Sequence, residues 1–382
     1  MHICFITNEY PKQGFPHGGI GSFVKTLAHE LIKKGNQVSI VGLNYEAKCE
    51  VETDNKVVIY RIGKSNIKGL SWFFNAKEIN KKIKEIHLQN PISIIESSEL
   101  GLAFLNKLQG IKYVIRLHGG HHFFAEAENR GINFWKGFQE KRSFKKADAF
   151  IAVSHYVKTH TETLLDFHNK PIAYISNPIN TELFKPLAGK EKKGSIVFAG
   201  TLCEKKGIRQ LIQAFAFVKK QFPEATLEIY GRDWLFPDGS SYKKMLEENE
   251  LPKLGFIAND IHFHGVVGFD EIPTRYAKAT VCVFPSHMET LGLVALEAMA
   301  MEKPVIFTNK GPGPEVIIDE KTGLLCDPHN PADIAAKIIW VLNNQEATKI
   351  MGIAAREEVL KNFGLEVLVD KNSQFYSGII NK

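Results

Sequence analysis

The sequence has 382 residues, of which 44% are hydrophobic and 24% charged, a composition typical of a soluble globular protein. A chain of this length exceeds one ordinary hydrophobic core, so we expect two domains of roughly 180–200 residues each. No uncharged apolar run reaches the ~20 residues that a membrane-spanning helix needs, and no basic segment opens the chain as in a signal peptide. The five cysteines are scattered and odd in number, which favours reduced, buried thiols in a cytoplasmic protein over disulfides or a metal site.

Both halves of the sequence alternate between short apolar strands and helices, a pattern that predicts an α/β fold with parallel sheets covered on both faces. In the first half, the expected strands are residues 3–7, 37–43, 93–96, 113–117 and 149–153, with a helix over 22–34. In the second half, the expected strands are residues 195–199, 226–230, 261–263, 280–284, 305–307 and 323–325. Helices are expected at 208–221, 272–279, 293–301, 331–343 and 364–379. The stretch 176–194 is rich in Pro, Gly and Lys, which marks a linker between two domains.

The glycine-rich loop that follows the first strand contains Gly18, Gly19 and Gly21 and leads into the expected helix at residue 22. Glycines at a helix start let backbone N–H groups approach a phosphate. The loop is not a dinucleotide-binding fingerprint, because its glycines come well after the strand and the second strand lacks the ribose-binding acid that should follow it. Taken alone, the loop is weak evidence for a phosphate site, because clusters of glycine are usually just turns.

The positive charge is concentrated in the first half of the chain. Residues 1–180 contain 24 Lys and Arg against 16 Asp and Glu, a balance of +8, whereas the remainder has a balance of −2. The excess gathers in two stretches expected to be helical, 77–84 and 136–146, and aromatic residues surround the second of them: Phe123, Phe124, Phe134, Trp135, Phe138 and Phe144. Such helices occur on anionic membrane surfaces, and they also occur as solvated faces over core aromatic residues. Nucleic-acid binding is not favoured, since the cations form no recognisable motif.

His118 stands at the end of the expected strand 113–117 and is followed by two glycines, His121 and His122. A histidine at a strand end can cap the strand or make a core hydrogen bond, and a cluster of three raises the question of zinc. No Cys, Asp or Glu nearby completes a plausible zinc ligand set. His121 and His122 receive no role from the sequence.

The loop after strand 195–199 reads Gly-Thr-Leu-Cys-Glu-Lys-Lys-Gly and contains Thr201, Lys205 and Lys206. A Lys-Lys-Gly sequence is usually a solvated helix start. The next two strand ends, at 230–233 and 262–266, read from their residues alone as ordinary turns, and the first of them carries Arg232.

Glu289 and Glu297 lie eight positions apart where strand 280–284 gives way to a loop and then to the helix 293–301. Ligands of open α/β sheets bind beyond the carboxyl ends of strands, and the free N–H groups of a helix start favour an anion such as a diphosphate. Two carboxylates beside that helix start suit a ligand that carries vicinal hydroxyls as well as phosphate. Glu297 has apolar neighbours, so its carboxylate needs a partner, unless the helix presents a solvated face there.

The sequence E-T-L-G-L-V-A-L-E-A-M-A, which starts at Glu289, resembles the signature of the retaining glycosyltransferases of family 4, in which seven residues separate two glutamates. The Lys-Gly at 206–207, the segment 176–194 and the turn 311–315 are similar to that family too, whereas Leu291 replaces a Phe and Thr201 an Arg. The resemblance implies the GT-B fold, in which two Rossmann-like parallel-sheet domains face a central cleft. The implied parts are an acceptor-side domain at 1–178, a linker at 179–194, a donor-nucleotide domain at 195–362 and a helix at 363–382 that crosses back to the first domain.

The resemblance also implies roles for individual residues. Glu297 is expected to bind the ribose of the donor, and Glu289 and His118 to act as the catalytic residues that orient the transferred sugar. Thr201 stands where the family has an arginine, and the positive charge lost there is expected to come from Lys205 or Arg232. The full set of expected donor-binding residues is Gly19, Thr201, Lys206, Arg232, Thr290, Leu291, Gly292, Leu293 and Glu297. No metal and no cofactor are expected, because no Asp-x-Asp sequence stands at an expected strand end.

The activity that the resemblance implies is the retaining transfer of a hexose-type sugar from a nucleoside-diphosphate sugar to a glycan or lipid-linked acceptor, in the assembly of a cell-surface polysaccharide. The expected location is the cytoplasm, or the inner face of the membrane if the cations of the first domain meet an anionic surface. Two alternatives stay open: a nucleotide-sugar 2-epimerase of the same fold, and a non-catalytic module that binds a sugar nucleotide. Thr201 favours the second of these.

Overall fold

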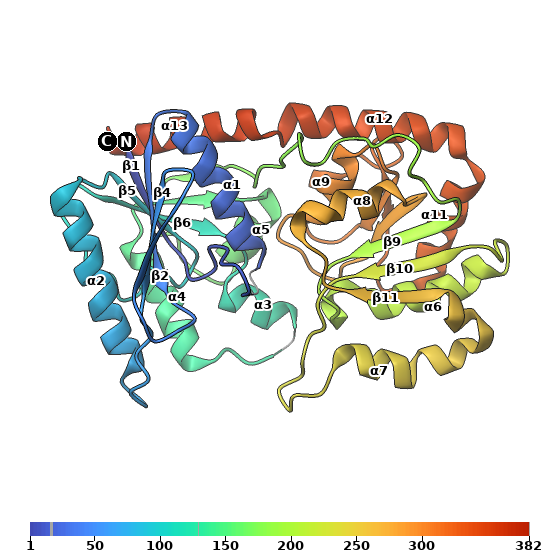
Figure 1. Cartoon of the computed structure of the whole chain (residues 1–382), viewed down its shortest axis with the longest axis horizontal. Coiled ribbons are helices and arrows are strands. Elements are labelled where there is room, and N and C mark those ends of the chain that lie inside the picture. The colour runs from blue at the N-terminus through green and yellow to red at the C-terminus, as the bar shows by residue number, and fades with distance from the viewer. Residues whose placement is uncertain (16–17, 129, 382) are drawn as a thin grey trace. The chain divides into compact units, whose positions relative to one another are not determined.

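The computed structural model describes residues 1–15, 18–128 and 130–381. Over these residues the chain forms two compact units (Figure 1). Unit 1 consists of Met1–Pro178 and Leu365–Lys382, and unit 2 of Ile179–Gly364. The final helix, α13 (Leu365–Ile380), therefore belongs to unit 1, and the segment 179–194 belongs to unit 2.

Unit 1 is built on an eight-stranded sheet in the order β3-β4-β2-β1-β5-β6-β7-β8. Neighbouring strands are parallel except for β3, which runs antiparallel to β4. The strands are β1 (His2–Ile6), β2 (Gln37–Leu43), β3 (Glu50–Asp54), β4 (Val57–Ile62), β5 (Ile94–Ser97), β6 (Lys112–Leu117), β7 (Ala149–Ala152) and β8 (Ile172–Tyr174). Every strand predicted for the first half is present, with ends shifted by one residue at most.

The hairpin of β3 and β4 corrects the prediction of a purely parallel sheet. Its two-residue turn consists of Asn55 and Lys56, with φ of 49° and 70°. Two-residue turns with two positive φ angles usually have the sequence Asn-Gly. The sequence Asn-Lys is therefore only a weak indication of a hairpin. No side chain of β3 is buried, and the strand therefore lacks the apolar alternation that identifies a strand in a sequence.

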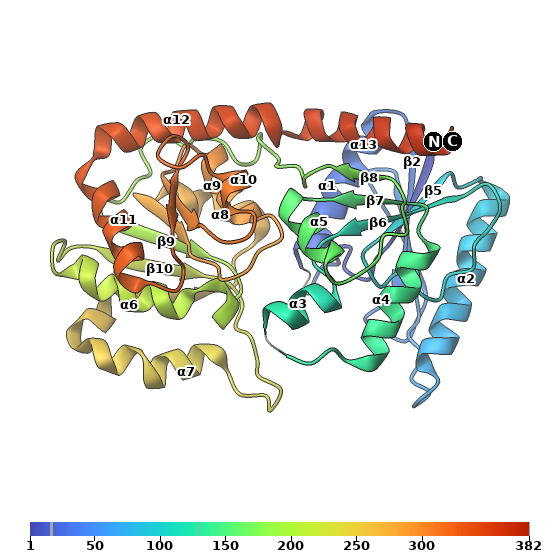
Figure 2. The ribbon, with the colours of Figure 1, turned by 180° about the vertical axis from the view of Figure 1, so that it is seen from behind.

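The helices of unit 1 are α1 (Gly19–Lys33), α2 (Ser71–Gln89), α3 (His121–Ala127), α4 (Phe134–Lys146), α5 (His155–Glu162) and α13. The contact between α1 and α13 joins the two ends of the chain within this unit (Figure 2). The first of these helices begins at Gly19, three residues earlier than predicted, because glycine has a low helix propensity and hides the start of a helix. Both basic stretches, 77–84 and 136–146, are helical as predicted and lie in α2 and α4.

Unit 2 is built on a six-stranded sheet in the order β11-β10-β9-β12-β13-β14, with all neighbours parallel. The strands are β9 (Ser195–Ala199), β10 (Thr226–Tyr230), β11 (Ile261–Gly265), β12 (Val281–Phe284), β13 (Val305–Thr308) and β14 (Leu324–Cys326). The predicted strands of the second half are confirmed to within two residues at each end. The chain adds β10 and β11 on one side of β9 and returns to place β12 on the other side. The switch point of the sheet, where ligands of such folds bind, therefore lies between β9 and β12.

The helices of unit 2 are α6 (Ile208–Lys219), α7 (Tyr242–Asn249), α8 (Ile272–Ala277), α9 (Leu293–Ala300), α10 (Gly313–Val316), α11 (Pro331–Asn343) and α12 (Gln345–Asn362). No helix in the described part of the chain is both long and apolar enough to cross a membrane. The five cysteines are all free thiols, as predicted, although Cys49 is exposed and not buried like the others.

Candidate functional site

The switch point of unit 2 brings two predicted site residues into contact. The loop after β9 carries Lys206, and the loop after the neighbouring strand β12 carries Glu289. The Lys206 ammonium group forms an ion pair with the Glu289 carboxylate, to which the hydroxyl of Ser286 also donates a hydrogen bond of 3.0 Å. Lys206 keeps 23% of its side-chain surface exposed and Glu289 11%, so the pair stays accessible from solvent.

A close backbone contact holds the two loops together. Gly207 has a φ of +70°, and a Cβ at this position would lie 1.8 Å from the carbonyl oxygen of Pro285. Only glycine allows both the left-handed backbone and this approach. The N–H of His287 donates to the carbonyl of Lys205 over 2.9 Å and closes the same contact. The position of Lys206 beside Glu289 is therefore fixed by the backbone and does not depend on its flexible side chain alone.

The predicted donor-binding stretch from Thr290 to Leu293 forms the end of the β12 loop and the start of α9. Leu291 is 3% exposed and belongs to the core, whereas Leu293 is partly exposed and begins the helix. Gly292 is the N-cap residue, and no side chain caps the helix. The first N–H groups of α9, with the positive end of the helix dipole, are thus available to an anion near Glu289.

Glu297 lies about one turn into α9. The hydroxyl of Tyr276, a fully buried residue of α8, donates to its carboxylate over 3.2 Å. The expectation that this carboxylate has a partner is confirmed. Burial raises the pKa of Glu297 to about 8, and the Tyr276 hydrogen bond only partly offsets that rise. A carboxyl group with such a pKa exchanges its proton near neutral pH.

Thr201 and Arg232 lie on neighbouring loops of the same sheet edge. The N–H of Gly200 donates to the carbonyl of Tyr230, and the N–H of Leu202 to the carbonyl of Arg232, each over 2.9 Å. The Arg232 side chain is exposed and forms no ion pair with any described acidic residue. The backbone of Arg232 is thus held beside the position that lacks the family arginine.

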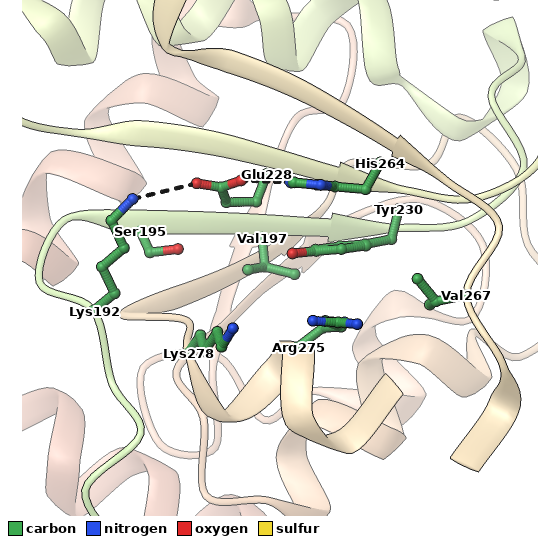
Figure 3. A pocket seen from close by; sticks show the side chains of 9 residues that line it. All are labelled: Lys192, Ser195, Val197, Glu228, Tyr230, His264, Val267, Arg275 and Lys278. Carbon is green, nitrogen blue, oxygen red and sulfur yellow. Dashed lines mark hydrogen bonds and ion pairs between the residues drawn. The ribbon is translucent and has the colours of Figure 1, made fainter. Parts of the chain in front are cut away.

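A cavity of about 320 Å³ lies on the face of the unit 2 sheet that α8 covers (Figure 3). In this cavity Glu228 accepts a hydrogen bond of 2.6 Å from His264, whose ring stacks on that of Tyr230 at 4.5 Å. Arg275 of α8 lies 6.0 Å from the Tyr230 ring. The full lining consists of Lys192, Ser195, Val197, Glu228, Tyr230, His264, Val267, Arg275 and Lys278. None of the predicted donor-binding residues is among them, so the cavity is separate from the Lys206–Glu289 pair.

In unit 1, His118 directly follows β6, as predicted. Its backbone N–H donates to the Glu99 carboxylate over 2.6 Å, and its ring lies 5.3 Å from that of Phe23 in α1. Burial, together with the positive charge of Arg116, lowers the pKa of His118 to about 3. The imidazole is therefore neutral throughout the physiological range, which makes it a hydrogen-bonding group and excludes an imidazolium acid.

The glycine loop lies at the same end of the unit 1 sheet as His118, because α1 carries both Gly19 and Phe23. A Cβ at Gly21 would lie 1.9 Å from the carbonyl oxygen of Glu9, so this glycine is required where the helix crosses the loop after β1. A Cβ at Gly19 would meet no described atom within 4 Å. The described residues therefore leave open the space that this Cβ would occupy at the first residue of α1.

The remaining histidines of the cluster are structural. The Glu140 carboxylate of α4 accepts the N–H groups of His121 and His122, each over 2.9 Å, and pairs with the His122 ring. His121 accepts the N–H of Asn133 over 2.8 Å. These bonds fasten α3 to α4. Nowhere in the described residues does a group of three or more His, Cys, Asp or Glu side chains meet in a way that could hold a metal ion.

Sequence patterns alone do not identify three further residues of these sites. They are Ser286, which donates to Glu289, Tyr276, which donates to Glu297, and Glu99, which accepts the N–H of His118. Glu99 had a usable signal, since it follows β5 closely and strand ends of a parallel sheet share one edge. Burial raises the pKa of Glu99 to about 8, because the hydrogen bonds that it accepts do not compensate for lost hydration.

Comparison with known proteins supports one family over most of the chain. Residues 17–183 match the family described as Glycosyltransferase Family 4, and residues 180–358 match Glycosyl transferases group 1. An uncharacterized glycosyltransferase of Methanocaldococcus jannaschii is 30% identical over 352 residues, which cover 91% of each chain. A glycogen synthase of Mycobacterium tuberculosis is 26% identical over 238 residues, or 61% of this chain and 54% of the synthase.

Solved structures share the fold. Sucrose-phosphate synthase from Thermosynechococcus elongatus superimposes with a TM-score of 0.86 at 21% identity, over 100% of this chain and 99% of the synthase. The Anabaena protein HepE, solved with UDP-glucose, superimposes with a TM-score of 0.77 at 17% identity, over 99% of this chain and 100% of HepE. Two parallel-sheet α/β units in this arrangement of elements form the GT-B fold, as predicted. The chain belongs to the group 1 glycosyltransferases of glycosyltransferase family 4.

Proposed function

We propose that this glycosyltransferase moves a hexose-type sugar from a nucleoside-diphosphate sugar to a glycan or lipid-linked acceptor and retains the anomeric configuration. The observation that carries the proposal is the contact between Lys206 and Glu289 at the switch point of unit 2. The cation and the carboxylate lie beyond the carboxyl ends of two neighbouring strands. They match the two parts of a donor, because Lys206 suits the diphosphate and Glu289 suits the sugar hydroxyls. The reaction requires neither a metal nor a cofactor in this proposal.

Lys206 and Glu289 neutralise each other in the structure. An arriving diphosphate is a stronger partner for the Lys206 ammonium group, because it carries more charge than a carboxylate. Glu289 is then free to accept hydrogen bonds from the sugar hydroxyls, while the first N–H groups of α9 face the phosphates. Catalysis consists of stabilising the leaving diphosphate and positioning the sugar, with no carboxylate nucleophile.

The other predicted residues complete the proposed site. Glu297 accepts the ribose hydroxyls, and Arg232 supplies the charge that Thr201 lacks. From unit 1, Gly19 contacts the donor through its backbone, and His118 orients the transferred sugar as a neutral hydrogen-bonding group. The HepE structures hold UDP and UDP-glucose, which supports a nucleoside-diphosphate sugar as the donor.

A non-catalytic module is the second candidate, because Thr201 stands where the family has a cation. A panel of UDP-, GDP- and ADP-sugars tests both, first by thermal shift and then by donor turnover without an acceptor. A ligand at 100 times its dissociation constant stabilises the fold by about 2.7 kcal/mol, which a thermal shift detects. Turnover of the stabilising donor to a nucleoside diphosphate and sugar supports the enzyme. Stabilisation without any turnover supports the binding module, and release of a 2-epimerised sugar supports an epimerase.

The raised pKa of Glu297 predicts a pH-dependent affinity for nucleotide. Ribose hydroxyls donate to the ionised carboxylate, so binding below pH 8 must first remove the proton from Glu297. The affinity for a nucleoside diphosphate should therefore fall by up to about tenfold for each pH unit below 8. The measurement is calorimetric titration at pH 6, 7, 8 and 9.

Glu297→Gln provides the matched control, because it keeps the shape of the side chain and cannot ionise. The phosphates of the ligand titrate equally in both proteins, so the ratio of the two affinities isolates Glu297. A ratio that stays constant between pH 6 and pH 9 would contradict the ribose assignment.

Two glycines of α1 should respond differently to alanine. Gly19→Ala should leave the midpoint of thermal unfolding unchanged, because the added Cβ meets no described atom, yet it should slow transfer by blocking the approach of the donor. Gly21→Ala should destabilise the fold by about 1–3 kcal/mol, because its Cβ collides with the Glu9 carbonyl. Thermal unfolding and transfer rates are measured on both variants. Full transfer activity in Gly19→Ala would contradict the role of this loop.

A further inference from the structure

A large groove in unit 1 lies outside both parts of the proposed site. It runs between α2 and α4, which lie side by side in Figures 1 and 2, and has a volume of about 820 Å³. The side chain of Asn80 in α2 donates a hydrogen bond of 2.8 Å to the carbonyl of Phe104, which lies in the segment between β5 and β6. This bond holds that segment against α2. We call this feature the α2–α4 groove, and its lining is Trp72, Phe73, Ala76, Lys77, Asn80, Lys81, Lys84, Phe104, Asn106, Trp135, Phe138, Arg142 and Lys146.

One side of the groove is a connected set of aromatic rings. The Trp72 ring lies 4.7 Å from Phe104 and 5.3 Å from Trp135, whose ring stacks on Phe138 at 5.8 Å. These contacts do not bury the cluster, since Trp72, Trp135 and Phe138 remain 38–43% exposed and Phe73 reaches 49%. So much exposed aromatic surface in one place indicates an interaction site, not a core.

The other side of the groove is cationic. Lys77, Lys81, Lys84, Arg142 and Lys146 line it, and no Asp or Glu is among the described lining residues. Lys77, Lys81 and Lys84 form no ion pair within the described parts of the chain, whereas Lys82 of the same helix pairs with Glu85. The hydrogen bond from Lys82 and, more weakly, the charge of Lys81 lower the pKa of nearby Glu85, but none of the three lysines forms an ion pair with a described residue, and the opposite side of the groove is aromatic.

The groove presents one stripe of α2 to solvent. Phe73, Lys77, Lys81 and Lys84 recur at helical spacing and are exposed, whereas Ile83 and other residues of the opposite side are buried. An apolar residue begins the stripe and lysines continue it. The stripe therefore offers an aromatic ring at one end and positive charge along the rest, on the side of α2 that faces away from the core.

We propose that the α2–α4 groove docks this protein onto a bilayer that contains anionic lipid. Aromatic rings such as those of Trp72 and Trp135 favour the headgroup region of a bilayer, which lies between the apolar acyl chains and water. The lysines meet the lipid phosphates in a groove whose described lining contains no carboxylate. Five cations with no carboxylate among the described lining residues favour an anionic surface over a neutral carbohydrate polymer, which carries no charge to pair with them.

The groove contains Trp135 and Phe138, two of the aromatic residues expected from the sequence to meet a membrane, but it does not contain Phe123. Phe123 is a core residue with 1% exposure and cannot contact a membrane, because α3 turns it inward. Trp72 and Phe73 take its place, from a helix for which the sequence predicted only charge. Docking depends on surface chemistry alone and is independent of the proposed transfer reaction.

Vesicle sedimentation tests the cationic side. The probes are phosphatidylcholine vesicles with and without phosphatidylglycerol, at low and high salt, with no donor present. The triple variant K77E/K81E/K84E should bind anionic vesicles at least about tenfold more weakly than the natural chain. The control K321E/K349E/K361E changes the same amount of charge at exposed lysines of unit 2 and should bind normally. Equal binding by both triple variants would overturn the proposal.

Tryptophan quenching by lipids with brominated acyl chains tests the aromatic side. The chain has four tryptophans, and the groove contains Trp72 and Trp135. The variant W234F/W340F should keep the full quenching on anionic vesicles, and W72F/W135F should lose it. Equal quenching in both variants, or binding to a soluble acidic polysaccharide without binding to vesicles, would overturn the proposal. A chain that binds anionic vesicles as expected but transfers no sugar would contradict the proposed function and leave the docking proposal intact.

Discussion

Glu289→Gln is expected to slow sugar transfer by about 100- to 1,000-fold, the usual effect of removing one preorganised group from the transition state. Glutamine keeps the length of the side chain but lacks the negative charge. The ionised carboxylate accepts hydrogen bonds from sugar hydroxyls more strongly than an amide does. Free nucleoside diphosphate lacks the sugar, so its dissociation constant should change by less than about tenfold, or 1.4 kcal/mol. A slight gain in affinity is consistent with this role, because Lys206 loses the carboxylate with which it pairs.

Transfer kinetics and calorimetric titration of the diphosphate check this result on the same protein samples. Lys206→Met is the matched comparison from the other side of the ion pair, and it should weaken diphosphate binding by more than about tenfold. Glu346→Gln, at an exposed position of α12, should change neither quantity. A Glu289→Gln variant that loses diphosphate affinity as strongly as Lys206→Met would assign Glu289 to the diphosphate and refute its assignment to the sugar.

Arg116→Met is expected to have the largest effect on stability, lowering the free energy of unfolding of unit 1 by about 3–5 kcal/mol. Arg116 is fully buried, and its Nε donates to the Glu96 carboxylate over 2.8 Å. The same carboxylate accepts the Tyr376 hydroxyl over 2.6 Å, and Asn372 accepts a hydrogen bond from the guanidinium group. Methionine fills a similar volume but leaves Glu96 as a buried charge without a counterion.

Denaturant unfolding monitored by fluorescence in a W234F/W340F background reports on unit 1, because the remaining tryptophans, Trp72 and Trp135, belong to it. Adding Glu96→Gln to Arg116→Met removes the unpaired charge and should restore part of the loss. Lys158→Met, which breaks an exposed pair with Glu162, should leave the midpoint unchanged. An unaltered midpoint in Arg116→Met would show that the buried network does not hold α13 to the sheet.

The sequence predicts the strands well, because buried parallel strands are runs of β-branched and aromatic residues with clear ends. It also predicts that Lys206 and Glu289 each follow a strand. Their contact could not be predicted without the family, since it depends on β9 and β12 being neighbours although β10 and β11 lie between them in the chain. The roles of Ser286 and Tyr276 could not be predicted for the same reason, because only tertiary packing brings their hydroxyl groups to the carboxylates of Glu289 and Glu297.

The first half shows where composition misleads. Phe123 and Trp135 are both aromatic residues near basic segments, yet Phe123 is buried and Trp135 lines an open groove. The difference follows from helix rotation, which residue type does not specify. Trp72 and Phe73 contribute to the same groove from a distant part of the sequence, so no local pattern reveals that the two basic helices form one surface.

The anomeric configuration of the first product tests the central claim most directly. Proton NMR follows the reaction of the donor that stabilises the chain most, and the coupling constant of the anomeric proton identifies the new linkage before any rearrangement. Retaining transfer at the Lys206–Glu289 site predicts the same configuration in the product as in the donor, and loss of that product in Glu289→Gln. An inverted linkage, or full product formation by Glu289→Gln, would contradict this account.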